Sequence, residues 1–543
     1  MRKLNLTLLI LTLSFAVLMS VPFLVPHMGW VALLGLVPLL LMDEVADAHG
    51  VKRFFWWYFL AFVLWNAATT FWVCNATVGG GIFAVVANSV QMSLIWTLFR
   101  FAKKKLEGVS PYVFLAAMWI AWERMYFNVQ ISWPWLTLGN SLARSVRLAQ
   151  WYEYTGALGG SLWIWVSNIW LFLIARSAID GSRFAKPRRS RLISDILCAA
   201  VILLPAALSF RIFARTQPCS DESLEVVVAQ PNFDPYEKFV SMTQAQQNVI
   251  LVDLLEQGLR HRDGQGGPVL LLGPETFTSD IVLGREELSP TWERICGLIE
   301  AHPEANIIFG ASTRECIGPE KGKAYTARKF RDGNWYISHN SAFITDTTRR
   351  TDVFQKSKLV IGVESMPWPR VFSWIDDKLG GVMGRCVGQD TVKTLHFRSY
   401  GPDGEIVQDI PIGCAVCYES VYGEYCTGYV KDGARALTVI TNDAWWGDTP
   451  GYRQHLSYAC LRAIETRRDI ARCGNTGISG FINRRGEITS ESRWWEREHI
   501  EGRISLYDGQ TFFVRHGDIT GRACTLVFFL FFLALLVRLI TRK

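Results

Sequence analysis

Residues 409–419 read Asp-Ile-Pro-Ile-Gly-Cys-Ala-Val-Cys-Tyr-Glu, an apolar run that ends in a cysteine and an acidic residue. The run is typical of a buried strand, which places Cys417 at the strand end. Glu275 follows a similar run, Val-Leu-Leu-Leu-Gly-Pro, and Lys356 lies in Phe-Gln-Lys-Ser-Lys-Leu-Val. A carboxylate, a lysine and a cysteine supply the base, the cation and the nucleophile that thiol-based acyl transfer requires.

Strand-like runs recur around these residues throughout 222–505. They lie at Leu224–Ala229, Val269–Leu272, Asn306–Ala311, Trp335–Thr345, Ile410–Val416, Ala436–Thr441 and Ser479–Ile482. Helical periodicity separates several of them, most clearly in 241–261 and 453–471. Strands that alternate with helices, with paired strands in the middle, predict a layered α/β domain.

Most of the remaining chain is apolar and predicts a membrane domain. A helix needs about 20 apolar residues to cross about 30 Å of hydrocarbon. We expect about eight spans, near residues 5–25, 29–42, 54–74, 80–100, 111–128, 160–178, 192–213 and 523–540. The first is read as an uncleaved anchor because a second apolar run follows it at once. The expected organisation is a membrane domain at 1–213, a linker at 214–221, the α/β domain at 222–505, a linker at 506–522 and a last span at 523–540.

The basic residues indicate the orientation of the spans. They gather in alternate loops, at Arg2, Lys3, Lys52, Arg53, Arg100, Lys103 to Lys105, Arg183, Lys186, Arg188, Arg189, Arg191, Arg542 and Lys543. By the positive-inside rule both termini face the cytoplasm, and seven spans then place 214–520 outside. The net charge of +7 says little by itself, but these basic runs are topology signals, and we expect no nucleic-acid partner.

Charged and sulfur-containing residues outside the trio have simpler interpretations. Glu123 and Arg124 end a span, and we expect them to pair with each other or with lipid headgroups. Cys414 and Cys417 have a redox or zinc spacing, but no second Cys/His pair accompanies them. We expect no metal and no cofactor, and whether any of the 12 cysteines form disulfides stays open.

Several motifs together resemble a known family. Pro-Glu275, Lys356 with Glu364 eight residues later, and Cys417-Tyr418-Glu419 resemble the nitrilase superfamily. The membrane frame and three further motifs narrow the resemblance to bacterial apolipoprotein N-acyltransferases: Asn442-Asp443-Ala444-Trp445-Trp446-Gly447, Gln454-His455 and Arg462-Ala-Ile-Glu465. This resemblance covers essentially the whole chain. It implies a polytopic α-helical membrane domain plus an extramembrane α/β nitrilase-like α-β-β-α sandwich.

The resemblance also implies roles for matching residues. Glu275 would be the general base, Cys417 the nucleophile and Lys356 the cation that steadies an oxyanion, with Glu364 as a second carboxylate that positions the lysine or the thiol. The implied supporting residues are Tyr418, whose N–H is a candidate oxyanion donor, Glu419, Tyr236 on a mobile arm, Asn442 and Trp445. Whether Asn442 and Asp443 act directly or only shape a turn is left open. The loop Ile361-Gly362-Val363 departs from the family's usual Pro-Phe-Gly, and Trp446 replaces its usual phenylalanine.

The implied activity is a two-step acyl transfer at a membrane. A phospholipid would donate an acyl chain to Cys417, and the thioester would pass it to the α-amine of a diacylated apolipoprotein. The expected setting is the bacterial inner membrane, with a monomeric multi-pass protein among membrane lipids and its catalytic domain in the periplasm. Two alternatives stay open: a membrane-anchored nitrilase-type amidase or hydrolase, and a transporter with an accessory soluble domain.

Overall fold

A computed structural model describes residues 2–185, 187–238, 240–262, 266–321, 324–378 and 383–541. The chain divides into two units, Met1–Thr216 with His516–Lys543 and Gln217–Arg515, called here unit 1 and unit 2. Three basic residues used for the predicted orientation, Lys186, Arg542 and Lys543, lie outside the described residues.

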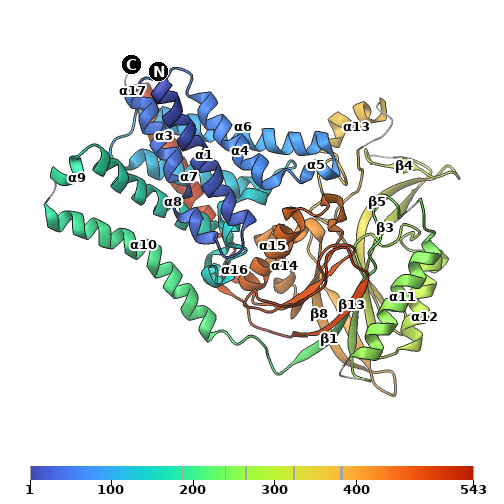
Figure 1. Cartoon of the computed structure of the whole chain (residues 1–543). Helices are drawn as coiled ribbons and strands as arrows, with labels where there is room; N and C mark the ends of the chain where they lie inside the picture. Colours follow the sequence, from blue (N-terminus) through green and yellow to red (C-terminus); the bar gives the residue numbers. More distant parts are fainter. Residues whose placement is uncertain are drawn as a thin grey trace. The chain divides into compact units, whose positions relative to one another are not determined.

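Unit 1 is helical. Its helices are α1 (Arg2–Leu24), α2 (Ala32–Gly35), α3 (Val37–Ala48), α4 (Phe55–Thr70), α5 (Val73–Ala76), α6 (Val78–Lys103), α7 (Ser110–Tyr126), α8 (Tyr152–Ile179), α9 (Ser182–Ala185), α10 (Arg188–Arg215) and α17 (Ile519–Thr541), labelled in part in Figure 1. Among the described residues, six segments are long and apolar enough to cross a membrane: Arg2–Leu24, Gly29–Ala48, Val78–Lys103, Tyr152–Ile179, Arg188–Arg215 and Ile519–Thr541.

Two of the eight predicted spans form shorter helices than expected. The helix at 54–74 ends at Thr70 and has 16 residues, and the helix at 111–128 has 17. At about 1.5 Å per residue each covers about 25 Å, less than the hydrocarbon thickness of about 30 Å. The predicted count of about eight spans is therefore supported, by length and composition, for six.

Glu123 and Arg124 do not pair with each other, which was the first of the two expected arrangements. Arg124 Nε lies 3.6 Å from Asp518 Oδ2, at the start of α17. The buried carboxylate of Glu123 accepts hydrogen bonds from Trp119 Nε1 at 3.1 Å and from the backbone N–H of Leu138 at 2.8 Å. Neighbouring residues on a helix point in different directions, so each of these two reaches a different segment of unit 1.

Unit 2 contains two mixed sheets. The first has the order β13-β1-β2-β3-β5-β4 with β6 beside β5, and β1, β2 and β3 are parallel. Its strands are β1 (Ser223–Gln230), β2 (Val269–Leu272), β3 (Ala305–Gly318), β4 (Arg328–Lys329), β5 (Trp335–Thr345), β6 (Thr351–Gln355) and β13 (Glu498–Ser505). The first and last strands of unit 2, β1 and β13, pair antiparallel, from Ser223 opposite Ser505 to Gln230 opposite Glu498.

The second sheet has the order β12-β11-β10-β9-β8-β7, with β8, β9 and β10 parallel. Its strands are β7 (Leu395–Tyr400), β8 (Ile406–Val416), β9 (Ala436–Thr441), β10 (Ile470–Gly474), β11 (Gly480–Ile482) and β12 (Ile488–Glu491). The central strands of both sheets are buried throughout, as parallel strands covered on both faces must be.

Helices cover the outer faces of the two sheets. The first sheet carries α11 (Gln244–His261) and α12 (Pro290–Ala301), and the second carries α14 (Gly423–Lys431) and α15 (Pro450–Thr466); α13 (Pro369–Lys378) and α16 (Phe512–His516) complete the set. Figure 1 shows α11 and α12 on one side of the strands and α14 and α15 on the other. The predicted α-β-β-α sandwich is confirmed.

The strand predictions are confirmed, whereas one helix prediction extends too far. The periodicity of 453–471 continues past the actual end of α15 at Thr466. Arg467 adopts a left-handed conformation with φ 51°, which ends the helix, and β10 begins three residues later at Ile470. The pattern misled because the buried strand β10 supplies Ile470 and Ala471, whose apolar side chains follow the helix after a short polar turn.

Candidate active site

Three strand ends supply the residues of the site. β2 leads through Gly273 and Pro274 to Glu275, β6 leads directly to Lys356, and β8 leads directly to Cys417. All three residues are buried. The turn that carries Glu275 packs against β3 so closely that a Cβ at Gly310 would lie 2.6 Å from Glu275 Cα. Only glycine fits at that position, which fixes where the carboxylate can be.

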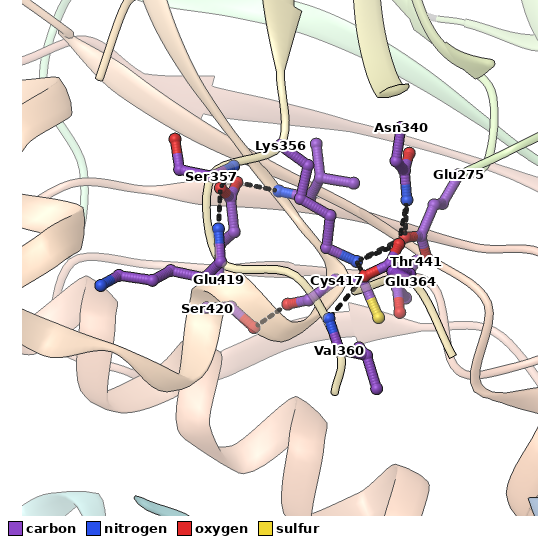
Figure 2. Close-up of polar contacts among 12 residues, drawn as sticks. Glu275, Asn340, Lys356, Ser357, Val360, Glu364, Cys417, Glu419, Ser420 and Thr441 are labelled. Carbon is purple, nitrogen blue, oxygen red and sulfur yellow. Dashed lines mark hydrogen bonds and ion pairs between the residues drawn. The ribbon is translucent and has the colours of Figure 1, made fainter. Parts of the chain in front are cut away.

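The Lys356 ammonium lies between two carboxylates. Its Nζ is 2.9 Å from Glu275 Oε1 and 2.9 Å from Glu364 Oε2 (Figure 2). Asn340 on β5 donates to both acids from the same Nδ2 atom, at 2.7 Å to Glu275 Oε1 and 2.6 Å to Glu364 Oε1. We call these four residues the Lys356 cluster. The structure thus brings the predicted base and cation into direct contact, with Glu364 as a third member.

The charge of Lys356 is fixed by this arrangement. Burial alone would lower its pKa, but the negative charges of Glu275 and Glu364 hold the pKa of Lys356 well above its ordinary value. A lysine that keeps its proton cannot accept one from a thiol. Lys356 is therefore a permanent cation, and a carboxylate is left as the proton acceptor.

The Cys417 thiol lies in the electrostatic field of this cluster. The thiol is hydrogen-bonded to the side chain of Thr441, which is labelled beside it in Figure 2. Burial raises the pKa of Cys417 well above its ordinary value; Glu275 raises it further and Lys356 opposes the shift. The resting thiol is therefore neutral, and its attack on an electrophile requires a base to remove the proton.

Cys417 has an unusual backbone. Its φ is 52°, in the left-handed region that residues with a Cβ rarely adopt. Such a conformation costs on the order of 1–3 kcal/mol, and it persists only where surrounding contacts enforce it. The conformation turns the chain out of β8, so the side chain leaves the strand alternation that places Cys414 inside the sheet.

A second buried ionic group enforces that turn. We call Asp443, His455 and Arg472 the Asp443 cluster. Asp443 Oδ1 contacts His455 Nδ1 at 2.9 Å, and Asp443 Oδ2 accepts from Arg472 Nη2 at 2.5 Å. His455 Nε2 lies 3.1 Å from the backbone carbonyl oxygen of Cys417, and the hydroxyl of Ser420 donates to the same oxygen at 2.8 Å. The nucleophile's carbonyl is thus held from two directions.

Glu419 connects the nucleophile turn to the lysine loop. Its buried carboxylate accepts hydrogen bonds from the backbone N–H groups of Val416 at 2.9 Å and Ser357 at 2.7 Å, and from the Tyr425 hydroxyl at 2.7 Å (Figure 2 draws the contact to Ser357). Burial raises the pKa of Glu419. The third residue of the Cys-Tyr-Glu motif therefore fixes the spacing between Cys417 and Lys356, and takes no part in their ion pairs.

The other predicted supporting residues lie around this centre. Tyr418 is buried and its ring packs edge-on against Tyr422. Tyr236 and Trp445 are exposed and pack together, with ring centroids 5.3 Å apart. Asn475 donates a hydrogen bond to Asn442. Asn475 also donates to the backbone carbonyl of Phe233, at the start of the arm that carries Tyr236.

Two contributors were missed in the sequence. Asn340 was not singled out, although a buried polar residue in the apolar strand Trp335–Thr345 was a signal that could have found it. His455 was noted only as part of a motif, because nothing in the sequence shows that α15 brings its ring to the Cys417 carbonyl.

The residues of unit 2 that could hold a metal ion lie outside the Lys356 cluster. Within the described residues, His261, His499 and Glu501 form the set whose potential ligand atoms lie within 4.8 Å of one another. They come from the end of α11 and from β13, and none of them belongs to the Lys356 cluster. Cys414 is buried in the sheet, so the two cysteines of the Cys-x-x-Cys spacing play different structural parts.

Two families match the chain in sequence. The family described as apolipoprotein N-acyltransferase N-terminal domain matches residues 15–170, and the carbon-nitrogen hydrolase family matches residues 273–512. The first match falls in unit 1 and the second in unit 2. The order of the matches is therefore the order of the two units along the chain.

Curated relatives are similar over almost their full length. An apolipoprotein N-acyltransferase of Chlorobaculum tepidum is 27% identical over 92% of this chain and 90% of its own length. A protein of the same name from Geobacter metallireducens is 24% identical over 94% and 91%. Among solved structures, Saccharomyces cerevisiae Nit3, of branch 10 of the nitrilase superfamily, is 14% identical, covers 53% of this chain and 92% of its own, and has a TM-score of 0.35.

Proposed function

We infer the reaction from one premise: the chain belongs to the apolipoprotein N-acyltransferase family, whose carbon-nitrogen hydrolase and N-terminal domains it contains in order. It is a membrane acyltransferase of lipoprotein maturation. We propose that its acyl donor is a phospholipid and that Cys417 carries the acyl group as a thioester. The acceptor is then the α-amine of the diacylglyceryl-modified cysteine at the N-terminus of an apolipoprotein.

One observation carries the catalytic part of the proposal. Lys356 is held as a cation between Glu275 and Glu364, and the neutral thiol of Cys417 lies in the field of Glu275 and Lys356. The arrangement supplies a proton acceptor and a fixed positive charge next to one sulfur. These are the requirements for forming and breaking a thioester.

The first half-reaction acylates the enzyme. Glu275 takes the thiol proton of Cys417, and the sulfur attacks the carbonyl carbon of a phospholipid ester. Lys356 and the backbone N–H of Tyr418 stabilise the negative oxygen of the tetrahedral intermediate. The carbon–oxygen bond of the ester then breaks, Glu275 returns its proton to the leaving oxygen, and a lysophospholipid departs.

The second half-reaction transfers the acyl group to nitrogen. The neutral α-amine of the apolipoprotein attacks the thioester carbonyl, and Glu275 takes a proton from the attacking nitrogen. The carbon–sulfur bond breaks, Cys417 recovers the proton, and an amide remains. Because an amine is a far better nucleophile than water at a thioester, a pocket that limits water favours transfer over hydrolysis.

The membrane helices account for the choice of substrates. A phospholipid and a diacylated lipoprotein both stay in a bilayer, so an enzyme that joins them must itself be held there. The distribution of basic residues supports, by the positive-inside rule, a position of unit 2 on the periplasmic side of the bacterial inner membrane. The Tyr236–Trp445 pair at the surface of unit 2 is proposed to contact an incoming substrate.

Mass spectrometry of the intact protein tests the proposal. Full-length protein purified in detergent and mixed with phosphatidylethanolamine of defined chain length should gain the mass of one acyl group, mapped to Cys417. The Cys417→Ala variant should gain none. Adding a peptide with a diacylglyceryl-cysteine at its N-terminus should remove the acyl group and produce the triacylated peptide.

The same mixture separates transfer from hydrolysis. A hydrolase would release free fatty acid at the same rate with and without the peptide, and the triacylated product would not form. An acyl group found on a cysteine other than Cys417 would overturn the assignment of the nucleophile. The names of the full-length relatives do not favour the hydrolase or the transporter alternative.

A further inference from the structure

The arm between β1 and α11 contains one buried charge among exposed residues. Tyr236 is 59% exposed and Val240 is 83% exposed, yet Lys238 between them is only 5% exposed. A lysine is rarely buried without a specific reason, because burial costs side-chain entropy and hydration. None of the active-site motifs includes Lys238.

Lys238 reaches the turn that carries the proposed base. Its Nζ donates to the backbone carbonyl of Thr276, the residue after Glu275, at 2.5 Å, and it lies 5.9 Å from the ring centroid of Phe277. Thr276 has φ 46°, a left-handed conformation that needs support in a residue with a Cβ. The contact therefore supports the strained residue of the Glu275 turn.

The arm is fixed where Lys238 leaves it. The backbone N–H of Lys238 donates to Asp234 at 2.8 Å, and its carbonyl accepts from the buried Gln247 Nε2 on α11 at 2.6 Å. Holding the backbone on both sides of the lysine reduces the entropy that the buried side chain loses. The arm is thus built to present this ammonium to the Glu275 turn.

The charge of Lys238 also acts on Glu275. Burial lowers the pKa of Lys238 to about 8, and the negative charge of Glu275 opposes the shift. The attraction is mutual, so the ammonium of Lys238 also stabilises the negative charge of the Glu275 carboxylate. The ionisable groups that face Glu275 are Lys356 after β6, Glu364 in the following loop, Cys417 after β8, Cys414 within β8 and Lys238 on the arm.

We propose that Lys238 is a positioning residue for the base: its ammonium holds the Glu275 turn, and its positive charge stabilises the carboxylate that takes the thiol proton. The inference rests on the proposed function, in which Glu275 takes the proton of Cys417. It links the arm that carries Tyr236 to the proton-transfer step, since the arm that meets the substrate also sets the state of the base.

The rate of Cys417 acylation as a function of pH tests this role. Full-length protein is mixed with phosphatidylethanolamine in detergent micelles, and the acyl adduct is followed by mass in a single turnover between about pH 5 and pH 9. In Lys238→Met the acidic limb of the rate–pH curve, where the rate falls as the pH drops, should move to higher pH by about one unit. The reason is that removing a nearby positive charge makes a carboxylate easier to protonate. The ratio of wild-type to variant rates should then rise to about tenfold at the acidic end.

Two further variants separate charge from support. Lys238→Gln can still donate to the Thr276 carbonyl but has no charge, so its limb should move as in Lys238→Met; it also serves if the methionine variant fails to fold. Lys238→Arg keeps the charge and should keep the wild-type limb, whatever its absolute rate. Lys431→Met, a change of an exposed lysine on α14, is the matched control.

A merely structural lysine would lower the rate equally at every pH. Limbs of Lys238→Met and Lys238→Gln that coincide with the wild-type limb would therefore overturn the inference. That result leaves the proposed function intact as long as the wild-type protein acquires an acyl group on Cys417. Absence of the adduct in the wild type would instead reject the proposed function.

Discussion

The Asp443 cluster and the Lys356 cluster, both buried in unit 2, serve different ends. In the Asp443 cluster one carboxylate meets Arg472 and His455, and the Thr441 hydroxyl donates to it as well at 2.9 Å. In the Lys356 cluster two carboxylates share one ammonium. Asp443 has its partners around both oxygens, so a further proton has little to gain there. In the Lys356 cluster the ammonium divides its charge, and one carboxylate remains able to take a proton from the thiol.

The pKa shifts agree with this contrast. Burial would raise the pKa of Asp443, but Arg472 and His455 hold it well below its ordinary value, so it stays ionised. The thiol beside the Lys356 cluster is instead held neutral. A carboxylate whose two oxygens both have partners fixes a backbone. Two carboxylates that share one ammonium leave one of them able to accept a proton.

Removing the shared cation should have the largest effect. Lys356→Met takes away the charge that stabilises the oxyanion, and acylation of Cys417 should fall by about a thousandfold. The same change should move the alkylation of Cys417 by iodoacetamide to higher pH, because Lys356 lowers the pKa of this thiol. Both are measured by intact mass, with Lys431→Met as control. Acylation within tenfold of the wild type would show that the lysine is dispensable.

Breaking the Asp443 cluster should mainly lower the free energy of unfolding. Asp443→Asn leaves Arg472 buried without its anion, which typically costs about 3–5 kcal/mol of unfolding free energy. The pKa of Asp443 is lowered in the folded state, so its contribution is present above the unfolded value of about 3.9 and is lost as the pH falls through the folded value. Thermal melts at pH 7 and near pH 3 should show a smaller gap between wild type and variant at the lower pH.

The bridge within the Lys356 cluster should have an intermediate effect. Asn340→Ala removes the donor that Glu275 and Glu364 share, and hydrogen bonds to charged groups contribute about 1.5–3 kcal/mol. Acylation should fall by about 10- to 100-fold, measured as single-turnover rates. Ser341→Ala, one residue along β5 and on its opposite face, should leave the rate within a few-fold. Equal losses in both variants would mean that β5 itself has been disturbed.

The smallest effect is expected at the exposed aromatic pair, which belongs to neither cluster. Tyr236→Ala and Trp445→Ala each remove a contact of about 0.5–1.5 kcal/mol, so each should raise KM for the lipopeptide by about 2- to 10-fold with little change in kcat. If the two rings act together, KM for the lipopeptide should rise no further in the double variant than in either single variant. Additive losses would show two separate contact sites.

Local patterns in the sequence were enough to predict much of unit 2. Val269–Leu272 and Ile410–Val416 are short, wholly apolar and followed by polar residues, so both the strands and the positions of Glu275 and Cys417 could be predicted. Lys356 was singled out at the end of a strand-like run, whereas Glu364 needed the resemblance, since a glutamate eight residues after a lysine has no local signature. The span counts were harder, because 54–74 and 111–128 are apolar beyond the ends of their helices at Thr70 and Tyr126.

Contacts between distant segments could not be predicted from the sequence. Asn340 and Glu275 are 65 residues apart, and His455 and the Cys417 carbonyl are 38 apart. The first pair meets because β5 and the turn after β2 pack together. The second meets because α15 packs against the turn after β8. Lys238 was not singled out for the same reason, since only the folded chain brings its Nζ to the Thr276 carbonyl.

The antiparallel pairing of β1 with β13 gives unit 2 an order of assembly. The chain enters this unit through β1 and leaves it through the strand beside it, so both connections emerge at one edge. During synthesis that edge stays open until residues 498–505 have been made, shortly before α17 follows along the chain. An open strand edge is prone to wrong pairing. Unit 2 is thus the part of the chain whose sheet stays incomplete until its own last strand has been made.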